Sequence, residues 1–295
     1  MSTETVLRSS GVYTTLLGAL NQFQAFTDLE YPRDMNFTTL NAKYFNAQGT
    51  SGVLNVALPP YPPILAYFGV GTEGFHNVGD HFSIPYPGDA RMMDLYSPIP
   101  IRCVRIDEEK DVLPASERSK YRLRVCKTIN GVPYALYYLK LIEFNRTIDV
   151  VTKDTDGVET PYAFDDSNLY PSPPAINETG GLIDTTVNRI IVRAKGTCTL
   201  RHDEIMEAVN VLYNGDTNFA KISEIGYYTG CDVDVSSDWT IPADEDTTTP
   251  RVFKEAVYVQ LAKGHCYRGS ELSTPNSIVR PIVTLESESC INGIV

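Results

Sequence analysis

The sequence predicts an α+β protein made mainly of antiparallel β-strands, with β-hairpins, an N-terminal helix and a C-terminal strand–helix–strand lobe. Three observations predict this class: two hairpin signals in the middle of the chain, helical spacing of apolar residues near the N-terminus, and a strand–helix–strand pattern near the C-terminus. The predicted parts are a helix with an extended region, a hairpin core, a loop and an αβ lobe, separate or in one continuous domain: 1–99, 100–165, 166–187 and 188–295.

The N-terminal helix is predicted from "VYTTLLGALNQFQAF", residues 12–26, which contains no charged residue. Its apolar residues recur at helical spacing and form one stripe. The stripe either packs in the protein's own core or belongs to an arm that docks on a neighbouring subunit, because an exposed apolar stripe is an association surface. The candidate subunit-contact residues are Val12, Leu16, Leu20, Phe23 and Phe26.

Two dipeptides predict hairpins in the central part of the chain. Asn130-Gly131 separates "YRLRVCKTI" from "VPYALYYLKLIEF", and Asp156-Gly157 separates "TIDVVTKDT" from "VETPYAF". Asn-Gly and Asp-Gly accept the positive φ angles of the turns that join twisted antiparallel strands. Residues 100–165 are therefore the predicted β core.

Proline-rich stretches predict extended segments on either side of this core. "LPPYPP", residues 58–63, reads as a rigid connection. Residues 165–181, "DDSNLYPSPPAINETGG", form a long polar loop with three prolines. Because loops of this length in a compact protein are usually functional or make contacts, Leu169 and Tyr170 are further candidate subunit-contact residues.

The C-terminal part predicts a strand over 188–200 and a helix over 201–216 that ends at Asn214-Gly215. Strands are predicted to follow at 221–230 and 253–263, with one more apolar run in the tail.

The segment "GVGTEG", residues 69–74, matches the G-x-G-x-x-G pattern of dinucleotide sites. Such a site needs a helix after the glycines, because the pyrophosphate rests on the helix N-terminus. The following residues contain Gly79, Pro85, Pro87 and Gly88, which leave no room for that helix. The glycines are instead predicted to allow sharp turns in an ordered loop, and no cofactor is expected.

Two groups of residues contain candidate metal ligands. His76, Asp80 and His81 could offer ligands, but a hydrogen-bonded loop is the favoured interpretation. Asp232 and Asp234 begin a run that resembles a calcium loop, but its sixth and twelfth positions lack the expected glycine and glutamate. That run is interpreted as a solvated acidic loop, so no metal is predicted.

Composition disfavours several classes of function. The net charge of −12 repels phosphate backbones and anionic lipid headgroups, and no apolar run has the length of a membrane-spanning helix. No G-x-S-x-G or H-E-x-x-H motif is present. The six cysteines are widely spaced and are expected to be free thiols. We therefore expect no enzyme activity and no nucleic-acid or membrane partner.

Three stretches resemble virion structural proteins of contractile-tailed bacteriophages, and the resemblance covers about half the chain: residues 67–109, 116–147 and 202–232. Residues 188–230 in particular resemble baseplate wedge subunits. The resemblance implies a tail subunit, in the baseplate or neck, that assembles with copies of itself and with other tail proteins. It also implies synthesis in the bacterial cytoplasm and localisation in the virion. The alternatives are a receptor- or glycan-binding tail module and a capsid or head-decoration protein.

Overall fold

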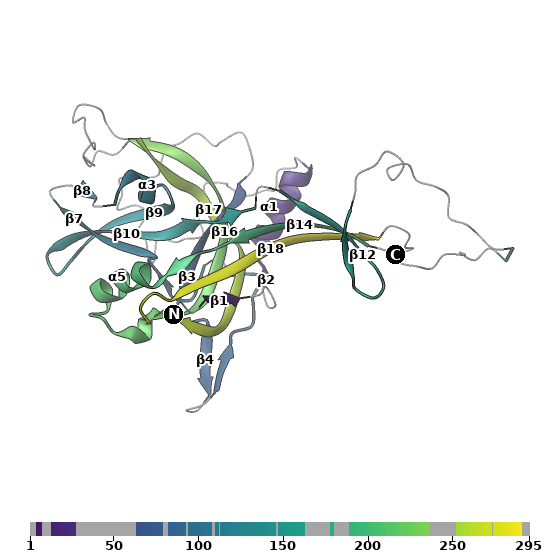
Figure 1. Cartoon of the computed structure of the whole chain (residues 1–295). Helices are drawn as coiled ribbons and strands as arrows, with labels where there is room; N and C mark the ends of the chain where they lie inside the picture. The colour runs from purple at the N-terminus through teal and green to yellow at the C-terminus, as the bar shows by residue number, and fades with distance from the viewer. Residues whose placement is uncertain are drawn as a thin grey trace. The chain divides into compact units, whose positions relative to one another are not determined.

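The structure is a computed structural model that describes residues 4–7, 13–27, 63–78, 82–92, 94–107, 110–111, 113–145, 147–162, 178–179, 189–236, 252–272 and 274–290. Strands predominate over helices in this part of the chain (Figure 1), as the α+β prediction requires. Among these residues, no helix combines the length and the apolar character needed to cross a bilayer. The elements are β1 (Glu4–Leu7), β2 (Tyr13–Thr14), α1 (Leu16–Thr27), β3 (Ile64–Gly71), β4 (Phe75–Val78), β5 (Phe82–Pro85), β6 (Pro98–Ile99), β7 (Arg102–Asp107), β8 (Lys110–Asp111), α3 (Ala115–Arg118), β9 (Tyr121–Ile129), β10 (Val132–Leu141), β11 (Glu143–Phe144), β12 (Asp149–Lys153), β13 (Glu159–Pro161), β14 (Arg189–Thr197), β15 (Leu200–Arg201), α5 (His202–Leu212), the 3-10 helix η1 (Thr217–Ala220), β16 (Lys221–Ser236), β17 (Val252–Glu271) and β18 (Ile278–Cys290).

The chain folds into two compact units. Unit 1 holds residues 1–142 and 198–281, and unit 2 holds residues 143–197 and 282–295. This division cuts the predicted hairpin core after residue 142, so its second hairpin lies in unit 2.

Unit 1 is organised around a nine-stranded sheet with the order β2-β17-β16-β3-β10-β7-β8, in which β9 also pairs with β10 and β6 with β3. The long antiparallel strands β16 and β17 are prominent in Figure 1. Every residue from 222 to 230 of β16 is buried. This strand is covered because β3 and β17 pair with its two edges and Tyr228 belongs to the buried core cluster.

The hairpin predicted at Asn130-Gly131 is confirmed. It joins β9 to β10, and the two turn residues have φ angles of 51° and 80°. Residues 135–140 of β10 are all buried, so this hairpin contributes to the core of unit 1.

Unit 2 is a small antiparallel sheet. Strand β14 pairs with residues 282–290 of β18 on one edge and with β12 and β11 on the other, and β13 follows β12. The hairpin predicted at Asp156-Gly157 is confirmed as the β12–β13 turn, in which Gly157 has a φ of 84°. All residues of β12 are only partly buried, and those of β13 are exposed.

The strand, helix and strand predicted from residue 188 onward occur in that order as β14, α5 and β16. The two strands belong to different sheets, so they do not form one three-element layer. Helix α5 ends as predicted, since Asn214 and Gly215 have φ angles of 51° and 79° and the Gly215 N–H donates to the Val209 carbonyl. Five described cysteines form no disulfide bond, as expected: Cys103, Cys126, Cys198, Cys231 and Cys266.

Candidate functional site: a tyrosine pair anchored by a buried carboxylate

The G-x-G-x-x-G stretch surrounds a buried carboxylate. Glu224 of β16 has no exposed surface. Its Oε1 accepts hydrogen bonds from the backbone N–H groups of Glu73, at 3.0 Å, and Ser97, at 3.1 Å, and its Oε2 accepts one from Tyr96 at 2.7 Å. Burial raises the pKa of Glu224, and these three hydrogen bonds oppose that rise. One side chain therefore ties the loop after β3 to the segment before β6.

The glycines of the motif make room for this carboxylate. A Cβ on Gly71 would lie 2.7 Å from Glu224 Oε1, and a Cβ on Gly74 would lie 2.3 Å from the Ser223 carbonyl oxygen. Gly71 is part of β3 and has no left-handed φ, so the prediction that these glycines serve sharp loop turns is wrong for Gly71. Strand β4 follows Gly74 where a dinucleotide site needs a helix, which agrees with the sequence-based rejection of such a site.

Two tyrosines stand at the surface beside this anchor. Tyr96 is 41% exposed and Tyr86 is partly buried, and their ring centroids are 4.9 Å apart with planes inclined by 55°. The backbone N–H of Tyr86 donates to the Gly74 carbonyl at 2.9 Å. Both segments that carry the rings are thus held by backbone hydrogen bonds to the Glu224 region. We call Tyr86 and Tyr96 the tyrosine pair.

The surface next to the tyrosine pair carries an ion pair. Asp89 accepts two hydrogen bonds from the Arg91 guanidinium, from Nε at 3.1 Å and from an Nη atom at 2.8 Å. These bonds lower the pKa of Asp89 to about 2, so it is ionised at neutral pH. Burial raises the pKa of Tyr96, and electrostatic interactions with Cys266, Glu224 and Asp89 raise it further.

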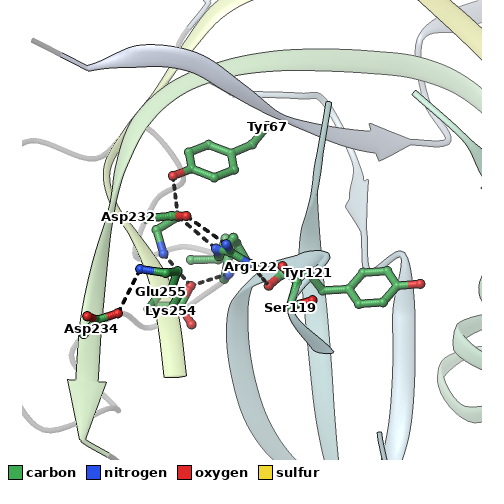
Figure 2. A network of polar contacts seen from close by, with 10 residues as sticks. Tyr67, Ser119, Tyr121, Arg122, Asp232, Asp234, Lys254 and Glu255 are labelled. Atoms are coloured by element: carbon green, nitrogen blue, oxygen red, sulfur yellow. Dashed lines mark hydrogen bonds and ion pairs between the residues drawn. The ribbon is translucent and has the colours of Figure 1, made fainter. Parts of the chain in front are cut away.

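A second polar cluster, drawn in Figure 2, joins residues of β3, β9, β16 and β17 in unit 1. Arg122 of β9 is 3% exposed, and its Nε and an Nη atom each donate to the Asp232 carboxylate at 2.8 Å. The Tyr67 hydroxyl donates to Asp232 at 2.7 Å. Burial alone would raise the pKa of Asp232, but the hydrogen bonds from Arg122 and Tyr67 outweigh it and lower that pKa.

Glu255 of β17 completes this cluster. Its carboxylate accepts the backbone N–H groups of Leu123 at 2.5 Å and Arg124 at 3.3 Å. Leu123 has a φ of 55°, an uncommon value for a leucine, which turns its N–H away from the β9–β10 ladder. Burial raises the pKa of Glu255, and the backbone hydrogen bonds and the Arg122 charge oppose that rise. We call Arg122, Asp232 and Glu255 the charged clasp, because it links β9 to β16 and β17.

The clasp corrects the interpretation of the acidic run at Asp232 and Asp234. Both residues belong to β16, so they do not lie in a solvated loop. Asp234 is exposed and its Oδ1 lies 3.1 Å from Lys254 Nζ. Within the described residues, no group of three or more His, Cys, Asp or Glu side chains is arranged to hold a metal ion.

A cavity of 390 Å³ lies between β7, α3 and α5. On its wall, Arg102 Nε is 3.0 Å from Glu207 Oε2, and the guanidinium lies 5.7 Å from the centroid of the Tyr121 ring. Burial raises the pKa of Glu207 to about 7, and the Arg102 charge opposes that rise. The adjacent Cys103 thiol is buried, and its pKa is raised to about 12, so it is not a nucleophile at neutral pH.

The raised pKa of Glu207 predicts a pH-dependent stability difference. Because the folded-state pKa exceeds the unfolded value, the stability that this carboxyl contributes is present below about pH 4.3 and is lost as pH rises through about 7. Glu207→Gln carries no titrating proton. The free energy of unfolding of this variant minus that of wild type should therefore increase between pH 5 and pH 8.5. Urea unfolding followed by circular dichroism measures the difference. Equal differences at both pH values would contradict the assignment.

The predicted contact helix packs differently from the expected stripe. Leu17 is 3% exposed and Asn21 is buried, with its Nδ2 donating to Thr229 and Gln260 at 2.9 Å each. A Cβ on Gly18 would lie 2.1 Å from the Ala262 carbonyl oxygen, so α1 approaches β17 closely at that point.

In the part of α1 whose side chains are described, the predicted stripe therefore does not face β17. Leu16 is 57% exposed and Leu20 is half-buried. The Leu16 N–H donates to the Ala90 carbonyl at 2.8 Å, which places Leu16 beside the loop of Asp89 and Arg91. Val12, Leu169 and Tyr170 lie outside the described residues, as do the side chains of Phe23 and Phe26.

Sequence reasoning missed Glu224 and Arg122 as organising residues. The available signal was a charged residue inside a strand-like run, in "KISEIGYY" for Glu224 and "YRLRV" for Arg122. A buried charge must be paired or hydrogen-bonded, so each of these residues called for a partner that sequence alone did not identify.

The fold and the site define an α+β protein of mainly antiparallel sheets in which buried charged side chains anchor loops and strands. The chain belongs to DUF7208, a family of unknown function, which matches residues 1–277. No curated protein and no solved structure matches it.

Proposed function

We propose that this chain is a structural subunit of a contractile phage tail, in the baseplate wedge or the neck. It assembles with copies of itself and with other tail proteins, and it is made in the bacterial cytoplasm and resides in the virion. The proposal rests on the sequence resemblance and on one structural observation. Helix α1 packs on β17 through small and polar residues, while the Leu16 side chain remains 57% exposed.

That observation supports assembly because it explains how α1 can pack within its own chain and still expose an apolar side chain to a partner. Thr15 caps α1, since its Oγ1 accepts the Gly18 N–H at 3.0 Å, and its own N–H donates to the Ala262 carbonyl at 2.9 Å. The helix is thereby fixed without burying Leu16. The exposed Leu16 offers apolar surface for a protein–protein contact.

The buried charges also suit a scaffold. Glu224 and Glu255 accept hydrogen bonds from backbone N–H groups, and Arg122 donates to Asp232. They specify loop positions and strand neighbours, which is what an assembly subunit needs from its surface-bearing segments.

A matched pair of variants tests the proposal. Leu16→Asp should leave the circular dichroism spectrum and the melting temperature close to those of wild type, because this side chain is largely exposed. The same variant should be recovered in purified tails at less than about a tenth of the wild-type amount if the contact is central, since buried hot-spot residues dominate interfaces.

Leu17→Asp is the control, because it places a charge at a site that is 3% exposed and should unfold the purified chain. Normal recovery of folded Leu16→Asp in tails would refute the α1 contact. Absence of the wild-type chain from purified tails would refute the proposed function.

A second candidate function is glycan binding by a tail module. The observation that favours it is the partly exposed tyrosine pair beside the Asp89–Arg91 ion pair, because aromatic faces with adjacent polar groups suit small-ligand recognition. Saturable binding of a purified surface polysaccharide that is lost in Tyr96→Ala would favour this candidate over assembly.

A further inference from the structure

We propose that Lys140 and Glu204 react with each other to form an intramolecular isopeptide bond, which joins β10 to α5 inside unit 1. This is a covalent modification of the chain by its own side chains, with no cofactor or second protein. It goes beyond the proposed function and does not depend on it. The bond gives unit 1 a covalent cross-link that its described cysteines do not supply.

The two reacting side chains are already in contact. Lys140 Nζ lies 2.7 Å from Glu204 Oε1, although the residues are 64 positions apart in sequence. Both side chains are buried, at 7% and 4% exposure, so their positions are fixed by the surrounding core. Groups held in reacting geometry behave as though their concentration were about 10⁵–10⁸ M. The fold therefore supplies the proximity that an uncatalysed amide condensation lacks in water.

Burial favours an amide at this position over an ion pair. In water, hydration stabilises an ammonium and a carboxylate, and condensation sacrifices that hydration. The pair of Lys140 and Glu204 has already lost most of its hydration on folding, so a neutral amide replaces two desolvated charges. The same burial excludes the water that would hydrolyse the product.

The neighbours of Glu204 supply a proton donor and an oxyanion donor. The Tyr121 hydroxyl donates to Oε1, which is the oxygen that must leave. Burial and the Glu204 charge raise the pKa of Tyr121, so the phenol keeps its proton at neutral pH. The Arg201 backbone N–H donates to Oε2 at 3.1 Å, within the distance range of oxyanion-hole donors. Negative charge that develops on Oε2 is therefore stabilised at the N-terminus of α5.

The reaction is a condensation in which atoms and charges balance. One proton moves from Lys140 Nζ to Glu204 Oε1 along their hydrogen bond, and the resulting amine attacks the Glu204 Cδ atom. The Nζ–Cδ bond forms, a second Nζ proton reaches Oε1 with the help of the Tyr121 hydroxyl, and the Cδ–Oε1 bond breaks. An ammonium and a carboxylate thus become one amide and one water molecule, without an oxidant or a co-reactant.

The product finds its hydrogen-bond partners in place. The new amide has one N–H to donate and one oxygen to accept. The Thr199 carbonyl already accepts from Lys140 Nζ at 2.8 Å, and the Arg201 N–H already donates to Glu204 Oε2. The amide therefore keeps its buried polar atoms satisfied without a rearrangement of β10 or α5.

Mass spectrometry of the purified, denatured full chain tests the inference. The wild-type mass should be lower than that of the sequence by one water molecule. Trypsin should release residues 128–146 and 202–221 as one cross-linked product, because it does not cleave after an acylated lysine. The digest is essential, since a succinimide at Asp156-Gly157 also loses one water. Lys140→Arg should have its full sequence mass and give no cross-linked product.

Two further measurements complete the test. Tyr121→Phe should form the cross-link about 100-fold more slowly, followed as the cross-linked fraction at successive times after cell-free synthesis. Lys254 is an internal control, because its Nζ lies 3.1 Å from Asp234 Oδ1 at an exposed site where hydration stabilises the charges; it should not be linked.

Three results would overturn the isopeptide bond: a folded wild-type chain of full sequence mass, a loss of water without the cross-linked product, or equal linkage at Lys254. A Tyr121→Phe chain that reacts as fast as wild type would overturn the role of Tyr121 as the proton donor.

Discussion

Arg122→Met should lower the free energy of unfolding by about 3–5 kcal/mol, because removing one partner of a buried ion pair leaves an uncompensated charge. Arg122 is 3% exposed, and methionine keeps much of its length while removing every donor to Asp232. Asp232 would then lose both hydrogen bonds that it accepts from the guanidinium. Urea unfolding at pH 7, followed by circular dichroism, measures the loss.

The pH dependence gives this prediction a specific signature. The pKa of Asp232 is lowered in the folded wild type, so the stability it contributes is present above about pH 3.9 and is lost as pH falls below that value. The difference in free energy of unfolding between Arg122→Met and wild type should therefore become smaller at low pH. Lys254→Met is the control, because its ion pair with Asp234 is about 60% exposed on both sides and contributes little. A gap that is independent of pH, or as small as that of the control, would show that the clasp is not a stabilising unit.

The hairpins were predictable because their signals are local. Asn130-Gly131 and Asp156-Gly157 fix positive φ angles at the turn, and the flanking runs need only pair with each other. The end of α5 at Asn214-Gly215 was predictable for the same reason. The assignment of the two hairpins to different units was not, because it depends on which distant strands cover them.

The packing face of α1 could not be predicted from residue size. Apolar periodicity favours the side of Leu16 and Leu20, but the helix approaches β17 on the side of Gly18. The missing side chain at Gly18 lets two backbones come close, and the polar Thr15 and Asn21 satisfy groups on the sheet. Close approach of backbones is a property of the pair of elements, so the stripe of the helix alone did not reveal it.

The high tyrosine content is also a weak predictor of contact surfaces. Eighteen tyrosines favour contact surfaces, yet many described ones lie in the core: Tyr67, Tyr121, Tyr137, Tyr138, Tyr227, Tyr228 and Tyr267. Their hydroxyls can be buried because polar partners are available, as the bond from Tyr67 to Asp232 shows. Exposure at Tyr96 follows from the position of its loop, which Glu224 determines from a strand 128 residues away in sequence.

Gly74→Ala should be among the most damaging substitutions that add a single methyl group. Its Cβ would lie 2.3 Å from the Ser223 carbonyl oxygen and 2.5 Å from the Glu224 Cγ atom, so backbone or a buried side chain must move. Overpacking of this kind costs about 1–3 kcal/mol, and more where a hydrogen-bonded group is displaced.

The effect of Gly74→Ala should reach the surface as well as the core, because Glu224 holds the Tyr96 and Glu73 amides. We therefore expect both a lower free energy of unfolding and faster exchange of the Tyr96 amide hydrogen, measured by urea unfolding and hydrogen exchange. Gly69→Ala is the control on β3, since its Cβ would meet the Leu139 and Tyr228 side chains and the Tyr138 carbonyl oxygen at 3.3 Å, which a shift of a few tenths of an ångström relieves. Gly69→Ala should lower the free energy of unfolding less than Gly74→Ala does, and it should leave exchange of the Tyr96 amide hydrogen unchanged. If Gly74→Ala leaves both measurements at wild-type values, the G-x-G-x-x-G stretch does not owe its glycines to the buried carboxylate.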